Sequence, residues 1–194
     1  MRRRGVVQKG GLPHRTVNIV PRFIEAIAQE AGLSFNAEND FADLRVSFGP
    51  RDVLGYLYAV LWAPSYVEQY DELLRADFAR VPLPPNGKLL RRLAQLGSEL
   101  ISLHIMESPK LNNKIFWSDD TVWLDKGETA GFAGVPEQVW NFYIGGYQIC
   151  DKWLKDGKGR VLSNEDVEHY HRMVLAVSCW RLQRETAGLW SRLL

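Results

Sequence analysis

Cysteine, histidine and long apolar runs are all scarce in this chain of 194 residues. Two cysteines, Cys150 and Cys179, are too few for a disulfide scaffold, so a reducing, cytoplasmic setting is expected. No segment approaches the roughly 18 consecutive apolar residues of a membrane-spanning helix. The basic N-terminus is not followed by the apolar stretch of a signal peptide. We therefore expect no membrane partner.

The familiar catalytic and phosphate-binding motifs are also missing. The segment "GGYQIC" has neither the spacing nor the Lys-Ser/Thr ending of a phosphate loop, and no G-x-S-x-G sequence is present. In a helix, His169 and His171 point about 200° apart, so they cannot both bind one metal ion. Cys150 follows Ile149 and is interpreted as a small core residue rather than a nucleophile. We expect no catalytic residue and no metal site.

Neither sign of charge is in excess, because 24 Lys and Arg face 23 Asp and Glu. The distribution is less even than the total. The first seventeen residues contain four arginines and one lysine but no acidic residue, which predicts a flexible basic arm over residues 1–17. Residues 18–194 are then expected to form a single domain.

Helical patterns dominate the first half of the chain. Residues 18–33 predict a helix with Pro21 in its first turn and Gly32 at its end. Residues 52–78 predict two helices separated at Pro64. The apolar side of the first of these two is expected to be formed by Val53, Leu54, Leu57, Tyr58 and Leu61. Residues 88–107 predict a fourth helix, with a leucine stripe formed by Leu89, Leu93, Leu96, Leu100 and Leu103.

The pattern changes after residue 111, where Trp, Phe, Val, Thr and Gly predict two or three short strands. Gly145 and Gly146 are expected to turn the chain from a strand into a helix that Gly157 ends. Ser163 is expected to cap a last helix. The predicted fold class is α+β, mainly helical, with a small antiparallel sheet inserted between the fourth helix and the C-terminal helices.

Three ordered blocks of this sequence resemble one protein family. They are "DVLGYLYAVLWAPSYVEQYDELLRADFARVPLP" at 52–84, "LGSELISLHIME" at 96–107 and "VWNFYIGGYQICDKWLKDGKGRVLS" at 139–163. They resemble the C-terminal specificity domain of Type ISP restriction-modification enzymes and related adenine-specific DNA methyltransferases. The resemblance covers roughly residues 17–185.

This resemblance implies a target-recognition module for double-stranded DNA that is not itself an enzyme. The chain has no Asn-Pro-Pro-Tyr or Asp-Pro-Pro-Tyr methyltransferase motif. S-adenosylmethionine is therefore expected only on a separate catalytic domain, and this chain is expected to bind no cofactor. A methyltransferase or nuclease chain is the expected protein partner.

Reading DNA requires cations that hold phosphates and polar side chains that reach base edges. For phosphates the candidates are the basic residues between positions 152 and 160, which follow the Gly145–Gly146 pair. For base edges they are polar residues near the predicted strands. The predicted DNA-binding residues are Lys152, Lys155, Lys158, Arg160, Gln148, Asn112, Asn113 and Lys114.

A second hypothesis comes from positions where the chain departs from the family pattern. Val67, Ser98 and Gly157 stand where the family often has arginine, and Ala79 where it prefers proline. Each lost phosphate contact lowers DNA affinity. The alternative is thus a truncated remnant that does not bind DNA and acts as a protein-interaction domain.

Overall fold

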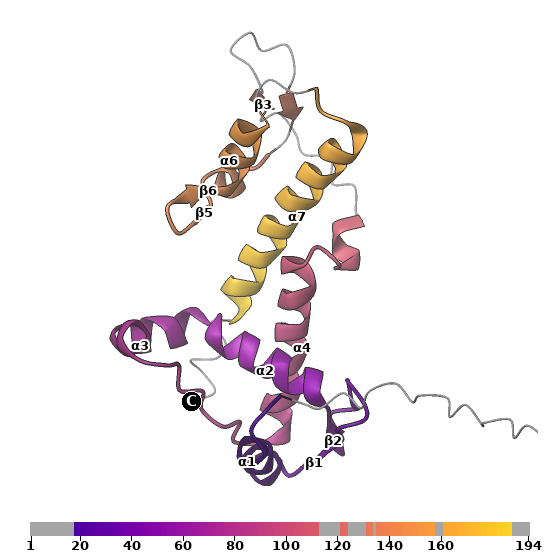
Figure 1. Cartoon of the computed structure of the whole chain (residues 1–194), viewed down its shortest axis with the longest axis vertical. Coiled ribbons are helices and arrows are strands. Elements are labelled where there is room, and N and C mark those ends of the chain that lie inside the picture. The colour runs from indigo at the N-terminus through magenta and orange to yellow at the C-terminus, as the bar shows by residue number, and fades with distance from the viewer. Residues whose placement is uncertain (1–17, 113–120, 124–130, 134, 158–160, 188–194) are drawn as a thin grey trace, which may run out of the picture.

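The computed structural model describes residues 18–112, 121–123, 131–133, 135–157 and 161–187. The predicted basic arm, residues 1–17, lies outside them. Figure 1 shows two groups of helices joined by one long helix, α4 (Gly87–His104). The predicted fold class is confirmed: the chain is mainly helical, and the strands β3 (Thr121–Trp123) and β4 (Gly131–Ala133) pair antiparallel between α4 and the C-terminal helices. Within the described residues, no helix has the length and hydropathy needed to cross a bilayer.

The first group of helices contains α1 (Pro21–Ala31), α2 (Pro50–Leu61), α3 (Pro64–Ala76) and the first half of α4. Pro21 opens α1, and Gly32 ends it with a φ of 66°, in the left-handed conformation that glycine adopts without a Cβ clash. The predicted break at Pro64 is confirmed. The core includes Ile27, Phe48, Val53, Tyr56, Val60, Tyr66 and Leu90.

The buried side of α2 differs from the predicted one. Val53 is buried as expected, but Leu54 is 50% exposed and Leu61 39% exposed. The helix instead buries Gly55, Tyr56, Ala59 and Val60. The reason is that α2 packs on α4 through its small residues. A Cβ placed on Gly97 of α4 would lie 1.7 Å from the Gly55 carbonyl oxygen, so the two backbones touch.

Two features that the sequence did not predict hold the segment before α2. Strand β1 (Ser34–Phe35) pairs parallel with β2 (Ser47–Phe48). The buried carboxylate of Asp52 accepts hydrogen bonds from the Gly49 N–H at 2.8 Å and the Ala42 N–H at 2.9 Å. Asp52 thereby fixes both the start of α2 and the loop that precedes it.

The proline-rich connector between α3 and α4 is fixed by two buried tyrosines. The Tyr56 hydroxyl donates to the Pro82 carbonyl oxygen at 2.5 Å, and the Tyr66 hydroxyl donates to the Arg80 carbonyl oxygen at 2.8 Å. Burial raises the pKa of both phenols, so they stay protonated and remain donors.

The second group of helices contains α5 (Glu137–Trp140), α6 (Ile149–Asp156) and α7 (Asn164–Ala187). The predicted Ser163 cap is confirmed: Ser163 Oγ accepts from the Asp166 N–H, and the Asp166 carboxylate accepts from the Ser163 N–H. Gly157 follows the last residue of α6, as expected. The core of this group comprises Val135, Val139, Cys150, Tyr170, Met173, Val174 and Val177.

Cys150 lies at the centre of this second core and is fully buried. Burial raises the pKa of its thiol to about 11. Because only the thiolate reacts, we expect iodoacetamide at pH 8 to alkylate Cys150 at least ~100-fold more slowly in the native protein than in urea. Mass spectrometry of the Cys150 and Cys179 peptides measures each rate. Equal Cys150 rates in both conditions would contradict this packing of α5, α6 and α7.

Candidate nucleic-acid interface

A small hairpin projects next to α6. Strand β5 (Tyr143–Ile144) pairs antiparallel with β6 (Tyr147–Gln148), and the turn consists of Gly145 and Gly146. Gly145 has a φ of 59°, which suits glycine at the first central position of a two-residue hairpin turn. The expectation that this glycine pair leads from a strand into a helix is therefore wrong. It leads from one strand into another, and α6 begins after the second strand.

The hairpin exposes large side chains. Tyr143 is 59% exposed, Ile144 56% and Tyr147 62%. The predicted base-contacting residue Gln148 is only half-buried, but its Nε2 donates to the Trp140 carbonyl oxygen. That bond anchors the hairpin to α5 and uses one of the amide's donors, which leaves Oε1 as the acceptor that could face a ligand.

The two described lysines of the predicted set lie on α6, beside this hairpin. Lys152 Nζ lies 2.8 Å from the Asp156 carboxylate, and Lys155 Nζ lies 2.5 Å from that of Asp151. Lys152 Nζ also lies 5.5 Å from the centre of the Tyr147 ring. The hydrogen bond and charge of Asp156 raise the pKa of Lys152. Exposed pairs of this kind are weak, so both lysines can exchange a carboxylate for a phosphate.

Trp153 attaches α6 to α7. Its ring centre lies 6.1 Å from that of His169, in a stacked arrangement, and 5.1 Å from that of Tyr170. The hairpin and the lysines are therefore carried by a helix that is packed, not loosely tethered. The direction in which the hairpin projects is set by the core beneath it.

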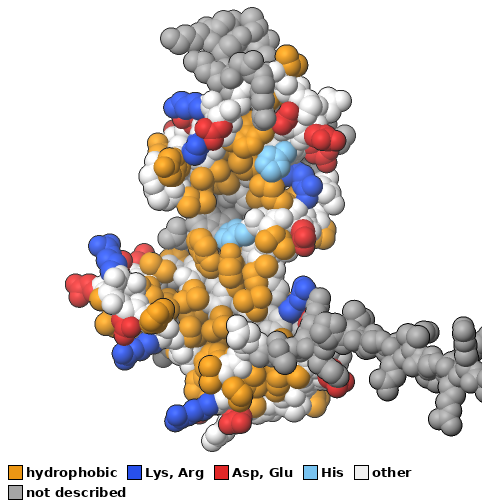
Figure 2. Space-filling view, in the orientation of Figure 1, with side chains coloured by type: hydrophobic (Ala, Val, Ile, Leu, Met, Phe, Trp, Pro, Cys, Tyr) orange, Lys and Arg blue, Asp and Glu red, His pale blue; other side chains and the backbone are white. Residues whose placement is uncertain are grey.

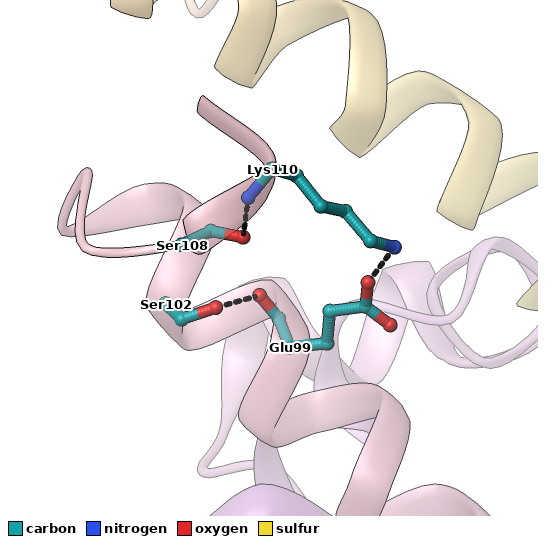
Figure 3. Close-up of polar contacts among 4 residues, drawn as sticks. All are labelled: Glu99, Ser102, Ser108 and Lys110. Atoms are coloured by element: carbon teal, nitrogen blue, oxygen red, sulfur yellow. Dashed lines mark hydrogen bonds and ion pairs between the residues drawn. The ribbon is translucent and has the colours of Figure 1, made fainter. Parts of the chain in front are cut away.

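Asn112, another predicted base-contacting residue, lies at the end of the 3-10 helix η1 (Pro109–Asn112). Figure 3 shows how α4 holds the start of η1: Lys110 forms an ion pair with Glu99, and the Lys110 N–H donates to Ser108 Oγ at 3.4 Å. The Ser108 N–H in turn donates to the Ser102 carbonyl oxygen at 3.0 Å. Asn112 is exposed at a fixed position.

A cleft of about 460 Å³ lies where η1 packs against the first half of α7. Asn112 borders it from η1, and its floor includes the buried Leu111 and Leu175. The sequence reasoning missed the polar residues that α7 contributes. They are Asn164, Glu168, His171 and Arg172, and the other three each lie three or four positions from Glu168, which places all of them on one side of the helix.

The structure does not bring the described candidates into one patch. In Figure 1, α6 and the hairpin lie on one side of α7, and η1 lies on the other. Residues Tyr170, Met173 and Val177 face the α6 side. The predicted opposition of His169 and His171 fits this division, because His169 stacks on Trp153 whereas His171 lines the cleft. Asn113, Lys114, Lys158 and Arg160 lie outside the described residues, so their roles stay predictions.

An apolar groove of about 270 Å³ lies where the two groups of helices meet. Figure 2 shows hydrophobic side chains gathered over this face, with charged side chains around its edges. His104 lies at the groove against Trp62, and burial lowers its pKa, which favours the neutral imidazole. The lining comprises Trp62, Leu103, His104, Met106, Phe142, Ile144, Ile149, Met173, Ala176 and Val177.

Comparison with known proteins gives a family. The model of the Type ISP C-terminal specificity domain matches residues 3–120 and 114–186. The chain belongs to the Type ISP C-terminal specificity domain family. This membership indicates a DNA target-recognition module of a restriction-modification system. The comparisons with curated proteins and with solved structures found no match.

The blocks that carry the family resemblance have distinct roles in this specificity domain. The first, at residues 52–84, builds the first core through Tyr56 and Tyr66 and fixes the start of α2 through Asp52. The third, at residues 139–163, forms the hairpin and α6. The third block also contributes Val139 and Cys150 to the second core, so in this specificity domain it combines scaffold residues with exposed aromatic and basic side chains.

Proposed function

We propose that this chain binds double-stranded DNA and reads its sequence for a restriction-modification enzyme. Methyl transfer from S-adenosylmethionine and DNA cleavage would be performed by another domain or chain, with which this one acts. The observation that most directly supports this proposal is the family match over most of the chain. The hairpin and α6 support it, because they combine exposed tyrosines with two lysines on one rigid corner.

A salt titration tests this proposal. Binding of the full chain to a short duplex is measured by fluorescence anisotropy over a series of KCl concentrations. We expect affinity to fall steeply with salt, because phosphate contacts release counterions. Replacing Lys152 and Lys155 by glutamine is expected to flatten the slope of log K against log salt by about 0.9 per lysine.

Lys88→Gln provides the matched control, since Lys88 is exposed at the start of α4 in the other group of helices. It should leave the slope unchanged. If Lys88→Gln flattens the slope as much as the α6 substitutions, the hairpin corner, which is the surface formed by the β5–β6 hairpin and α6, is not the phosphate-binding surface. If the chain binds no duplex even at the lowest salt, DNA binding itself is excluded.

Two observations favour the second candidate function, a protein-interaction domain that does not bind DNA. The groove at the junction of the two groups of helices is apolar and aromatic apart from His104. Exposed apolar surface of this kind is typical of protein contacts. Both α6 lysines also already pair with carboxylates. The salt titration distinguishes the two functions.

A further inference from the structure

The cleft between η1 and α7 is lined by polar groups of mixed type over an apolar floor. Asn112 and Asn164 each offer an amide donor and acceptor, Glu168 offers a carboxylate acceptor, and His171 and Arg172 offer ring and guanidinium nitrogens. Beneath them lie Leu111 and Leu175, which are 3% and 1% exposed. The cleft therefore suits a flat ligand with a hydrogen-bonding edge.

Two residues that line this cleft each contain a buried nitrogen atom without a partner among the described residues. Among the described residues, His171 Nε2 and Arg172 Nε are buried and form no hydrogen bond. Arg172 is nevertheless held in place, since its Nη2 donates to the Met106 carbonyl oxygen. Neither atom is accessible to solvent, so the exposed polar groups of the cleft are those of Asn112, Asn164 and Glu168.

The charges around the cleft argue against a phosphate group. Glu168 lines it, and the adjoining first turn of α7 carries Glu165 and Asp166. The Ser163 side chain already accepts from the Asp166 N–H at the start of this helix. A phosphate would meet carboxylates there, whereas a neutral heteroaromatic edge would meet both donors and acceptors.

We propose that this cleft holds the edge of a nucleobase and determines part of the recognised sequence. This inference rests on the proposed function. Asparagine amides pair with the edge of adenine, and a glutamate accepts from the amino group of cytosine. The hairpin corner on one side of α7 holds phosphates, and the cleft on the other side discriminates between bases.

Sequence selection with matched variants tests the inference. The full chain selects from a pool of duplexes with randomised centres, and the bound sequences are read. The same selection is run with Glu168→Gln and Asn112→Ala, which change exposed side chains, and with Glu165→Gln, which makes the same charge change on α7 without lining the cleft. Circular dichroism and thermal melting check that each variant is folded.

We expect Glu168→Gln and Asn112→Ala to change the preferred base at one or a few positions. They should lower the ratio of preferred to random-sequence affinity roughly 10-fold or more. Glu165→Gln should retain the original preference. The salt slope should stay the same in all three, because none of them removes a cation.

The same selection distinguishes a failure of the cleft proposal from a failure of the proposed DNA-binding function. If the unmodified chain binds duplexes with no base preference, or with a preference that neither cleft substitution alters, the inference is wrong while DNA binding stands. If it binds no duplex at all, the proposed function fails, and the cleft proposal fails with it.

The base edge could be presented in a groove or by a base that has left the stack. A mismatch placed opposite the base that the cleft reads separates these sources. Tighter binding to the mismatched duplex indicates an unstacked base, because less pairing energy is lost. Unchanged or weaker binding indicates that the edge is read in the groove.

Discussion

Gly97→Ala is expected to destabilise the chain by about 3 kcal/mol. A Cβ at this position would lie 1.7 Å from the Gly55 carbonyl oxygen, 2.6 Å from its carbon and 2.9 Å from the Ala59 nitrogen. All three are backbone atoms, which cannot rotate away as a side chain can. The helices α2 and α4 would have to separate, and the first core is built on their contact.

The sign of this effect is informative. In an isolated helix, alanine is favoured over glycine by roughly 1 kcal/mol, so a loosely packed α4 would gain stability from the change. Urea denaturation of the full chain measures the difference. Gln95→Ala, at an exposed position of the same helix, is the control and should change stability by less than about 0.5 kcal/mol. A Gly97→Ala variant as stable as this control would show that α2 and α4 do not touch as described.

The second large effect is expected for Asp52→Ala, which should cost about 3 kcal/mol. The substitution removes the acceptor of two backbone donors, the N–H groups of Gly49 and Ala42. Hydrogen bonds to a charged group contribute roughly 1.5–3 kcal/mol each, and a buried donor left unpaired costs its desolvation. The start of α2 would lose its cap, and the loop before it would lose its attachment.

Asp52→Asn distinguishes the contribution of the hydrogen-bond acceptor from that of the negative charge. The amide keeps the shape and one oxygen, so we expect a loss between that of alanine and zero. Denaturant unfolding gives the free energies, and hydrogen exchange of the Gly49 and Ala42 amides reports the local effect. Equal exchange in the native protein and in Asp52→Ala would mean that the carboxylate does not hold these amides.

The helices of this chain were largely predictable, because their signals are local. The Gly32 end of α1, the break at Pro64 and the leucine stripe of α4, of which only Leu96 is not fully buried, each follow from a few neighbouring residues. The buried side of α2 was not predictable in the same way. That helix has two apolar sides that could each be buried. The side with Gly55 packs on α4, because a residue without a side chain lets the α4 backbone come close. That preference depends on Gly97, more than forty positions away in sequence.

The candidate site was predicted only in part, for a similar reason. Asn112 is exposed and borders a polar cleft, and the two described lysines stand beside an exposed hairpin. The cleft residues Glu168 and His171 were missed because their segment resembles an ordinary capped helix. The side of α7 that carries Glu168 and His171 becomes part of a cleft only because η1, which is distant in sequence, packs against this helix.

The α4 helix has a consequence for how the two groups of helices move. Its eighteen residues span about 27 Å at 1.5 Å per residue. Its first half lies in one core, and Leu103 near its end packs with Leu175 of α7 in another. A continuous hydrogen-bonded rod, instead of a hinge, therefore sets the separation of the two halves. A rotation of the second half would thus be transmitted through α4 to the first half, and to any domain attached to that half.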